Sequence, residues 1–234
     1  MAAETQVLVD NEKKYIAKFF SDASESDVKK VDLSTLSWAK HTITLSGAAS
    51  PNFKIGEVLT VGAEKYLVTG FTAGASTVEV VGWDNTNKKA TAIDASSSNG
   101  DAVSGGVSGS NTRTYSSIAE QDFNVLVTKI MWICNGLQVA IEWDGSGSEA
   151  YIAELIANGI WSMPAMELPG IGINASGDSG DVLGDIQFST TGHASGDSYT
   201  VIMELKKQSG YDIPAYEQNN ILGYPVDYLL GNFT

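Results

Sequence analysis

Short apolar segments alternate along most of the chain with clusters of glycine, asparagine, aspartate and serine. The apolar segments are rich in Val, Ile, Thr, Tyr and Phe, which favour the half-buried surface of a pleated strand, and the polar clusters are typical of turns. The pattern therefore predicts a β-rich protein. The expected strands are Thr5–Val9, Tyr15–Phe20, Val28–Leu36, His41–Leu45, Glu57–Val61, Tyr66–Phe71, Thr77–Trp83, Phe123–Ile133, Gln138–Trp143, Asp185–Ser189 and Tyr199–Lys206.

One segment, Glu149–Asn158, has a different period. Its apolar residues Ile152, Leu155 and Ile156 would share one face of a helix, and Gly159 follows as a stop signal. The sequence thus predicts a single short helix in a chain that is otherwise all-β.

The distribution of charge divides the chain into two parts. Between Trp38 and Ser116 six cations balance six anions, whereas the remaining residues carry 8 − 22 = −14 charges. Near the end of the neutral block, Ala95–Gly109 is a tract of Ser, Gly and Asn, which is typical of flexible connections. We therefore expect a β-sandwich host domain built from 1–37 plus 117–207, and an inserted small β-barrel or meander module over 38–116.

The last segment, 208–234, differs in amino-acid composition from the rest of the chain. It contains no Lys or Arg, two prolines and several aromatic residues, too many for a typical disordered tail. We expect an extended C-terminal arm that packs either on its own domain or on a neighbouring subunit. Its candidate partner-binding residues are Tyr211, Tyr216, Tyr224, Tyr228 and Phe233.

Composition and charge exclude several classes of protein. The chain has 234 residues, of which 14 are Lys or Arg and 28 are Asp or Glu, and Arg113 is the only arginine. Nucleic-acid binding needs a basic surface, so neither nucleic acid nor an anionic membrane is an expected partner. The apolar run Val125–Ile133 is about half of a membrane span and is interrupted by Lys129. A single cysteine, Cys134, allows no intramolecular disulfide, and the N-terminus lacks a signal-peptide pattern.

The string Gly177–Asp181 contains the GDSG motif of trypsin-like serine proteases. Chain order would allow His41, then Asp84 or Asp144, and finally Ser179 to form a triad. However, the sequence around His41 does not match that family, and Asp181 would place a negative charge beside the oxyanion site. We therefore expect no catalytic residues and no enzymatic activity.

Metal and cofactor chemistry is also not expected. Asp178, Asp181 and Asp185 lie close together among glycines and could offer oxygen ligands to calcium, but their spacing is not that of an EF-hand. The two histidines, His41 and His193, are too few for a histidine-rich metal site. A polar turn is the simpler interpretation.

Exposed tryptophans could alternatively stack on sugars, as they do in carbohydrate-binding modules. The five candidates are Trp38, Trp83, Trp132, Trp143 and Trp161. Trp132 and Trp143 lie in strongly apolar predicted strands, which favours a place for them in the core.

A series of sequence segments (phrases) in the predicted β-sandwich domain resembles small β-sandwich virion structural proteins of tailed bacteriophages, which are capsid-decorating or head-associated proteins. The phrases are Val31–Leu36, Lys129–Trp132, Val139–Asp144, Gly184–Gly192 and Asp197–Lys207. The similarity covers about half of the chain and is a pattern of strands. The neutral insert and the aromatic extension depart from the compact family form.

The resemblance implies a structural protein that decorates or cements the capsid through symmetric self-assembly and contacts of its arm. Implied partners are the major capsid protein or other virion proteins, together with copies of the chain itself, a trimer being favoured. The implied location is the capsid surface, after synthesis in the host cytoplasm. Two alternatives stay open: a tail or adhesin module that binds host glycans and, more remotely, a serine hydrolase.

Overall fold

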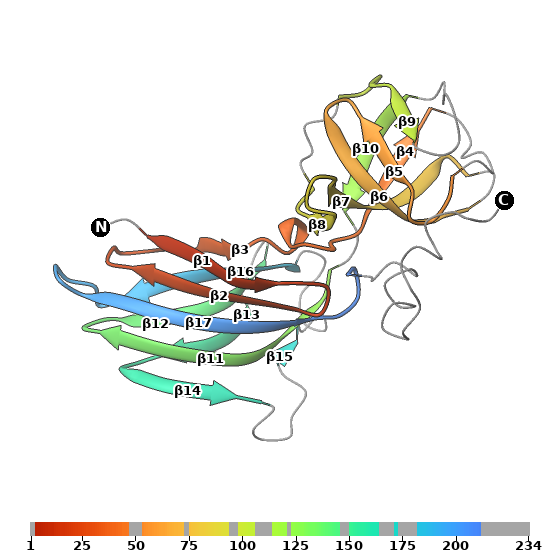
Figure 1. The fold of residues 1–234 in the computed structure, drawn as a ribbon. Coiled ribbons are helices and arrows are strands. Elements are labelled where there is room, and N and C mark those ends of the chain that lie inside the picture. Colours follow the sequence, from red (N-terminus) through yellow and green to blue (C-terminus); the bar gives the residue numbers. More distant parts are fainter. Residues whose placement is uncertain are drawn as a thin grey trace. The chain divides into compact units, whose positions relative to one another are not determined.

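The computed structural model describes residues 3–46, 53–72, 75–93, 98–105, 114–120, 123–145, 150–163, 171–172 and 182–211 (Figure 1). The chain divides into two compact units. The first contains Met1–Leu33 and Phe123–Ser209, and the second contains Ser34–Asp122 with Gly210 and Tyr211. Nearly all regular structure in the described ranges is β-strand, which confirms the predicted all-β class. None of the described residues forms a helix that could cross a membrane.

The first unit consists of two antiparallel sheets, which we call sheet A and sheet B. Sheet A has the order β1 (Glu4–Asp10), β2 (Lys14–Ser21), β17 (Ser198–Lys207), β11 (Val125–Asn135) and β14 (Asn158–Ser162), with β15 (Ile171–Gly172) also paired to β11. Sheet B has the order β13 (Ala150–Leu155), β12 (Gln138–Gly145), β16 (Val182–Thr191) and β3 (Val28–Val31).

Alternating burial in sheet A shows which of its faces is covered. Along β2 and β17, every second residue is buried and the residues between them are partly or fully exposed. The buried side chains meet sheet B through aromatic contacts: the Phe188 ring of β16 lies 5.2 Å from the Phe19 ring and 6.0 Å from the Tyr199 ring. Two sheets that bury their apolar faces against each other form a β-sandwich, as predicted.

The predicted helix over Glu149–Asn158 is wrong. Ala150–Leu155 form strand β13, and β14 begins at Asn158. In the pairing of β13 with β12, Ile141 faces Ala153 and the next residue, Glu142, faces Tyr151, so Ile152 is an extra residue in a β-bulge. The bulge allows Ile152 and Leu155 both to be buried although they are three residues apart. That spacing imitates the period of a helix.

The second unit is built on one seven-stranded antiparallel sheet. Its order is β10 (Tyr115–Glu120), β4 (His41–Leu45), β7 (Thr77–Asp84), β6 (Glu64–Phe71), β5 (Val58–Val61) and β9 (Val103–Gly105), with β8 (Lys89–Thr91) also paired to β7. A bridge between Ala102 and Thr114 joins the two ends of the sheet, and the Tyr115 N–H donates to the Asp101 carbonyl at 2.8 Å. The sheet therefore closes into a small barrel.

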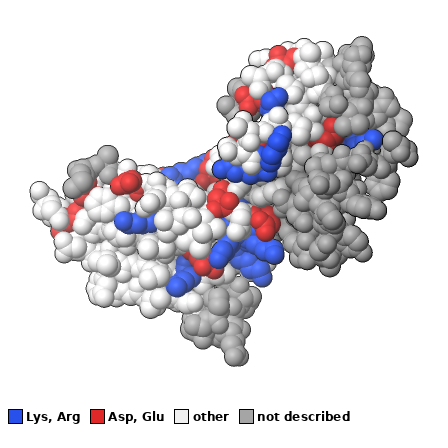
Figure 2. All heavy atoms as spheres, in the orientation of Figure 1, with Lys and Arg blue, Asp and Glu red and all other residues white. Residues whose placement is uncertain are grey.

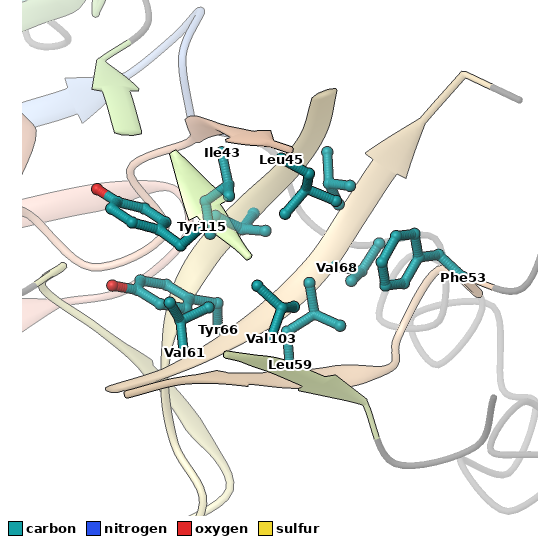
Figure 3. Close-up of a cluster of buried hydrophobic side chains, with 11 residues drawn as sticks. Ile43, Leu45, Phe53, Leu59, Val61, Tyr66, Val68, Val103 and Tyr115 are labelled. Atoms are coloured by element: carbon teal, nitrogen blue, oxygen red, sulfur yellow. The ribbon is translucent and has the colours of Figure 1, made fainter. Parts of the chain in front are cut away.

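The barrel encloses an apolar core of its own (Figure 3). Its members are Ile43, Leu45, Phe53, Leu59, Val61, Tyr66, Val68, Val78, Val80, Val103 and Tyr115. On the other face of β6 and β7, Leu67 and Val81 form a second cluster with Trp38 and Ala90. Both faces of these two strands are thus covered, which explains why consecutive residues are buried at 66–68 in β6 and at 80–82 in β7.

The unit boundaries, 33/34 and 122/123, differ from the expected ones, 37/38 and 116/117. Strand β10 continues to Glu120 and pairs with β4, with Ile118 facing Ile43. Residues 117–120 therefore belong to the barrel. Charge alone could not reveal this, because a strand's membership depends on its backbone partner.

The aromatic contact between the sheets generates a stability prediction. Phe188 is fully buried, so Phe188→Ala removes a ring from between Phe19 and Tyr199 and leaves a cavity. We expect the free energy of unfolding to fall by about 3–5 kcal/mol in urea titrations followed by circular dichroism. The control Tyr151→Ala, at a side chain that is 69% exposed, should change it by less than about 0.5 kcal/mol. A loss below about 1 kcal/mol for Phe188→Ala would contradict this packing.

Candidate functional site

The outer face of sheet A, which points away from sheet B, carries a row of apolar side chains. The register places Ile202 of β17 beside Met131 of β11, and Met131 beside Ile160 of β14. Ile133, which follows Met131 by two residues on β11, lies next to this row. The exposed fractions are 63% for Ile133, 62% for Ile160 and 38% for Met131.

Strand β2 extends the apolar row. Phe20 faces Thr200, which in turn faces Ile133 on its other side. We call the five apolar residues the outer-face patch: Phe20, Met131, Ile133, Ile160 and Ile202. Sheet A faces the viewer in Figure 1, and Figure 2 shows that most of the surface over its strands is neither acidic nor basic. An exposed apolar surface of this kind is a candidate contact site.

Charged residues border the outer-face patch. Lys18 faces Ile202 from β2, and in the next row Lys129 of β11 faces Glu204 of β17. The Thr128 hydroxyl lies 3.3 Å from a carboxylate oxygen of Glu204. An apolar centre with a polar border is the usual anatomy of a protein–protein interface.

A pocket of about 610 Å³ adjoins the patch and shares Phe20 with it. Its other lining residues are Asp22, Ala23, His193, Ser195, Gly196 and Ser198. The Nε2 atom of His193 lies 3.1 Å from the main-chain carbonyl oxygen of Asp22, so in this hydrogen bond the ring nitrogen donates. A carbonyl fixes the ring's orientation without the added negative charge that a catalytic carboxylate supplies. This pocket is suited to receiving a side chain or small polar group.

The first unit contains a buried ion pair between Lys30 and Glu25. The Lys30 ammonium donates to Glu25 at 2.7 Å, and the Tyr199 hydroxyl donates to the other carboxylate oxygen at 2.6 Å. Burial and this hydrogen bond to Glu25 raise the pKa of Tyr199 well above its usual value. The Lys30 ammonium also lies 6.0 Å from the centres of the Phe188 and Tyr199 rings. Each charged group has a hydrogen-bonding partner, so the role of this cluster is structural.

A second ion cluster contains Asp185, considered above as a calcium ligand, and Asp144, considered above as a triad member. Buried Asp185 accepts hydrogen bonds from the Leu33 N–H at 2.8 Å and from the Lys29 ammonium at 2.5 Å, and Asp144 lies 4.0 Å from the same ammonium. Burial raises the pKa of Asp185, and the hydrogen bond to Asp185 raises that of Lys29. The other two proposed calcium ligands, Asp178 and Asp181, lie outside the described residues. Over the described ranges, no group of three or more His, Cys, Asp or Glu is placed to hold a metal ion.

The remaining residues of the considered triad have local roles in the barrel. His41 is buried on β4, with its Nδ1 atom 3.3 Å from the Ala39 carbonyl oxygen. Asp84 accepts hydrogen bonds from the Asn87 side-chain amide at 2.6 Å and from the backbone N–H groups of Asn87 and Thr86 at 3.0 and 2.9 Å. These hydrogen bonds cap the turn after β7 and lower the pKa of Asp84. Ser179, with the whole 177–181 motif, lies outside the described residues.

The tryptophans considered for sugar binding are largely packed. Trp143 and Trp38 are buried, the former as predicted for a core residue, whereas Trp132, for which a core position was also predicted, and Trp161 are only partly buried. Trp83 is half-buried and packs against the cluster that contains Trp38. The indoles of Trp38, Trp83 and Trp143 do not form an open stacking platform.

Of the five candidate arm residues, the structure describes Tyr211. It is 5% exposed and forms a bridge with Ala39, while the Lys40 N–H donates to the Gly210 carbonyl at 2.8 Å. Tyr211 therefore packs within its own chain. Tyr216, Tyr224, Tyr228 and Phe233 lie outside the described residues, so their role stays a prediction.

Sequence reasoning missed the outer-face patch, although a signal was present. Val125–Ile133 is apolar on both faces of a strand, a pattern usually interpreted as burial on both sides. In sheet A, only one of these faces is covered by sheet B. The excess of apolar residues on the second face is the signal that could have indicated an interaction surface.

Comparisons with known proteins give no family. No protein-family model and no curated protein matches the chain. One similar solved structure is described as the complete structure of manganese lipoxygenase of Gaeumannomyces graminis and partial structure of zonadhesin of Komagataella pastoris, with 11% identity, coverage of 90% of this chain and 84% of that chain, and a TM-score of 0.14. Another is collagen adhesin from S. aureus, with 10% identity, coverage of 88% and 80%, and a TM-score of 0.12. Scores this low do not bear on fold or function.

The hairpin of β1 and β2 contains a buried phenol that generates a pH prediction. Burial, and then the nearby carboxylate of Asp10, raises the pKa of Tyr15 from 10.0 to about 12. Asp10 also accepts a hydrogen bond at 2.6 Å from Lys207, whose pKa burial lowers. Between pH 10 and 12, Tyr15 is deprotonated in the unfolded chain but still protonated in the folded chain. Deprotonation therefore stabilises the unfolded chain, and the free energy of unfolding falls as pH rises through this range.

We therefore expect Tyr15→Phe to reduce the loss of stability between pH 10 and 12 by about 2–3 kcal/mol, since one pKa unit corresponds to about 1.4 kcal/mol. Comparing the variant with the natural chain cancels the opposing contribution of Lys207. The measurement is urea unfolding at a series of pH values, with exposed Tyr151→Phe as the matched control. Parallel pH curves for the natural chain and Tyr15→Phe would show that the phenol does not carry this effect.

Proposed function

We propose that the chain is a structural protein of a bacteriophage virion that decorates or cements the capsid. The observation that carries this proposal is the outer-face patch, an exposed apolar surface on a rigid sheet of an acidic chain. The sequence phrases that resemble phage virion proteins include Lys129–Trp132 and Asp197–Lys207, which supply Met131 and Ile202 to that patch. The similarity and the surface therefore point to the same strands.

The proposed partner is the major capsid protein or another virion protein, on the capsid surface after synthesis in the host cytoplasm. The patch offers the apolar centre of the contact, and the adjoining pocket at Phe20 and His193 offers a recess for a partner side chain. Copies of the chain act in a symmetric set, for which a trimer is favoured. A net charge of −14 suits a protein that meets other proteins rather than nucleic acid.

The alternatives have less support. Binding of host glycans through aromatic platforms needs exposed rings, whereas Trp38 and Trp143 are buried and Trp83, Trp132 and Trp161 are partly buried. A serine hydrolase needs a histidine and an aspartate free to act together, whereas His41 and Asp84 each have a structural hydrogen bond in the barrel.

Ile133→Lys tests the proposal, because it puts a charge in the centre of the outer-face patch without touching the core. We expect the variant to bind purified capsid shells lacking this protein at least about tenfold more weakly than the natural chain, since burying an isoleucine contributes about 1.5–3 kcal/mol. Binding is measured by co-sedimentation over a concentration series. The control Tyr151→Lys changes an equally exposed residue of sheet B and should bind normally.

Two results would contradict the proposal: a natural chain that does not bind shells, or an Ile133→Lys variant that binds as tightly as the natural chain. A glycan array with the same proteins tests the main alternative. A glycan signal that survives Ile133→Lys would favour the adhesin interpretation.

A further inference from the structure

Besides the two-residue strand β15, the two sheets of the first unit end in four edge strands, β1, β14, β13 and β3. Edge strands expose unpaired backbone groups, and proteins commonly protect them with charged residues and β-bulges. Three of the four have both protections. The extra residues of their bulges are Leu8 in β1, Ile152 in β13 and Lys30 in β3, and each of these strands contains at least one charged residue.

Strand β14 has neither protection. Asn158–Ser162 contains no charged residue and no proline, and its register with β11 is unbroken from Lys129↔Ser162 to Ile133↔Asn158. Figure 1 shows β14 at the border of sheet A, and no strand among the described residues pairs with its other edge. The centre of this edge, Ile160, is a largely exposed member of the outer-face patch.

Hydrogen bonds at the two ends of the β11–β14 ladder show which backbone groups face the edge of β14 that no described strand pairs with, which we call the open edge. The Cys134 N–H donates to the Ala157 carbonyl at 2.5 Å, and the Met163 N–H donates to the Thr128 carbonyl at 2.9 Å. In an antiparallel pair, hydrogen-bonded positions alternate, so 157, 159, 161 and 163 turn their backbone groups toward β11. The residues that turn theirs toward the open edge are Asn158, Ile160 and Ser162.

We propose that β14 pairs antiparallel with β14 of a second copy of this chain, about a twofold axis at Ile160. In this register Ile160 faces Ile160 of the second copy, and Asn158 faces Ser162. All three outward residues then occupy hydrogen-bonded positions, where each facing pair exchanges two backbone hydrogen bonds. A shift by one residue would instead align outward groups with inward ones.

The side chains support a second copy as the occupant. Read in opposite directions, the strand matches itself: polar ends meet polar ends and the apolar centre meets the apolar centre. On the outer face, the two Ile160 side chains join two outer-face patches into one continuous apolar surface. The absence of charge in β14 also lets two copies of an acidic chain approach along this edge.

The inner face of β14 is compatible with the same register. The Trp132 indole covers Gly159, where an added Cβ would collide with the ring, and the Trp132 Nε1–H donates to the Ile156 carbonyl at 3.1 Å. Across the twofold axis, Gly159 faces Trp161 of the second copy. The glycine thus accommodates the Trp132 ring, and Trp161 of the second copy would lie on the same face beside it.

The pair is a weak contact in isolation. One short strand buries less surface than the roughly 800 Å² per partner of a stable interface. Copies held close together on a shell have a high effective concentration, which makes such a contact persistent. Because self-assembly belongs to the proposed function, this inference rests on it. A twofold contact joins copies in pairs, so a threefold set needs another surface as well.

Disulfide mapping in purified protein tests the register without capsid shells. The buried free thiol is first replaced in a Cys134→Ser background. In that background, Ile160→Cys brings two copies of one residue to a Cα separation of about 5.5 Å, within disulfide range. Under mild copper-phenanthroline oxidation at high protein concentration, we expect it to yield covalent dimer at least about tenfold faster than Val7→Cys, a control on β1 with 53% exposure.

Ser162→Cys alone should not cross-link, because identical residues at that position are about 13 Å apart along the strand axis. A mixture of Asn158→Cys and Ser162→Cys chains should cross-link as heterodimer. Equal rates for Ile160→Cys and Val7→Cys would overturn the proposal, as would efficient self-linking of Ser162→Cys. Correct cross-linking by a chain that does not bind shells would overturn the capsid role and leave this contact standing.

A proline variant separates the edge contact from the fold. The N–H of Ile160 faces the open edge, so Ile160→Pro removes a donor that β11 does not use. We expect sedimentation equilibrium to show concentration-dependent dimer for the natural chain and at least about tenfold weaker association for the variant, with unchanged circular dichroism. Ile160→Lys provides the same readout if proline disturbs folding. Dimerisation that survives the substitution would overturn the proposal.

Discussion

The contact of Phe188 with Phe19 and Tyr199 determines which side of sheet A is covered. Aromatic rings of this size dominate the energy of a small core, and strands allow only two side-chain directions. Once every second residue of β2 and β17 turns toward sheet B, the residues between them must turn toward solvent. The exposure of Ile133 and Ile160 is therefore a direct result of packing on the opposite face.

The parts of the fold that could be predicted from sequence are those where one strand has one buried face. His41–Leu45 is predicted with its observed bounds, and the alternation along Tyr199–Lys206 correctly indicates β17. The failures have specific causes. The bulge at Ile152 gave a strand the spacing of a helix, and β10 crosses the point at which the charge balance changes. Both depend on backbone pairing with distant residues, which a local pattern does not contain.

The candidate site was less predictable than the fold because its residues are ordinary apolar ones. Catalytic and metal sites leave unusual combinations in a sequence, and the combinations found here, around His41 and Asp185, have local structural partners in the described residues. An interaction surface leaves only an excess of apolar residues, and that excess has no meaning until the covered face is known. The register of β11 with β14 and β17 brings the residues of the outer-face patch together.

The indole of Trp132 over Gly159 links two positions that are far apart in the printed sequence. A side chain at 159 would collide with the ring, and a smaller residue at 132 would leave the glycine and the edge of the sheet uncovered. Neither residue can therefore be replaced alone without changing this contact. The shape of this edge of the sheet therefore depends on the two positions together, as one structural unit.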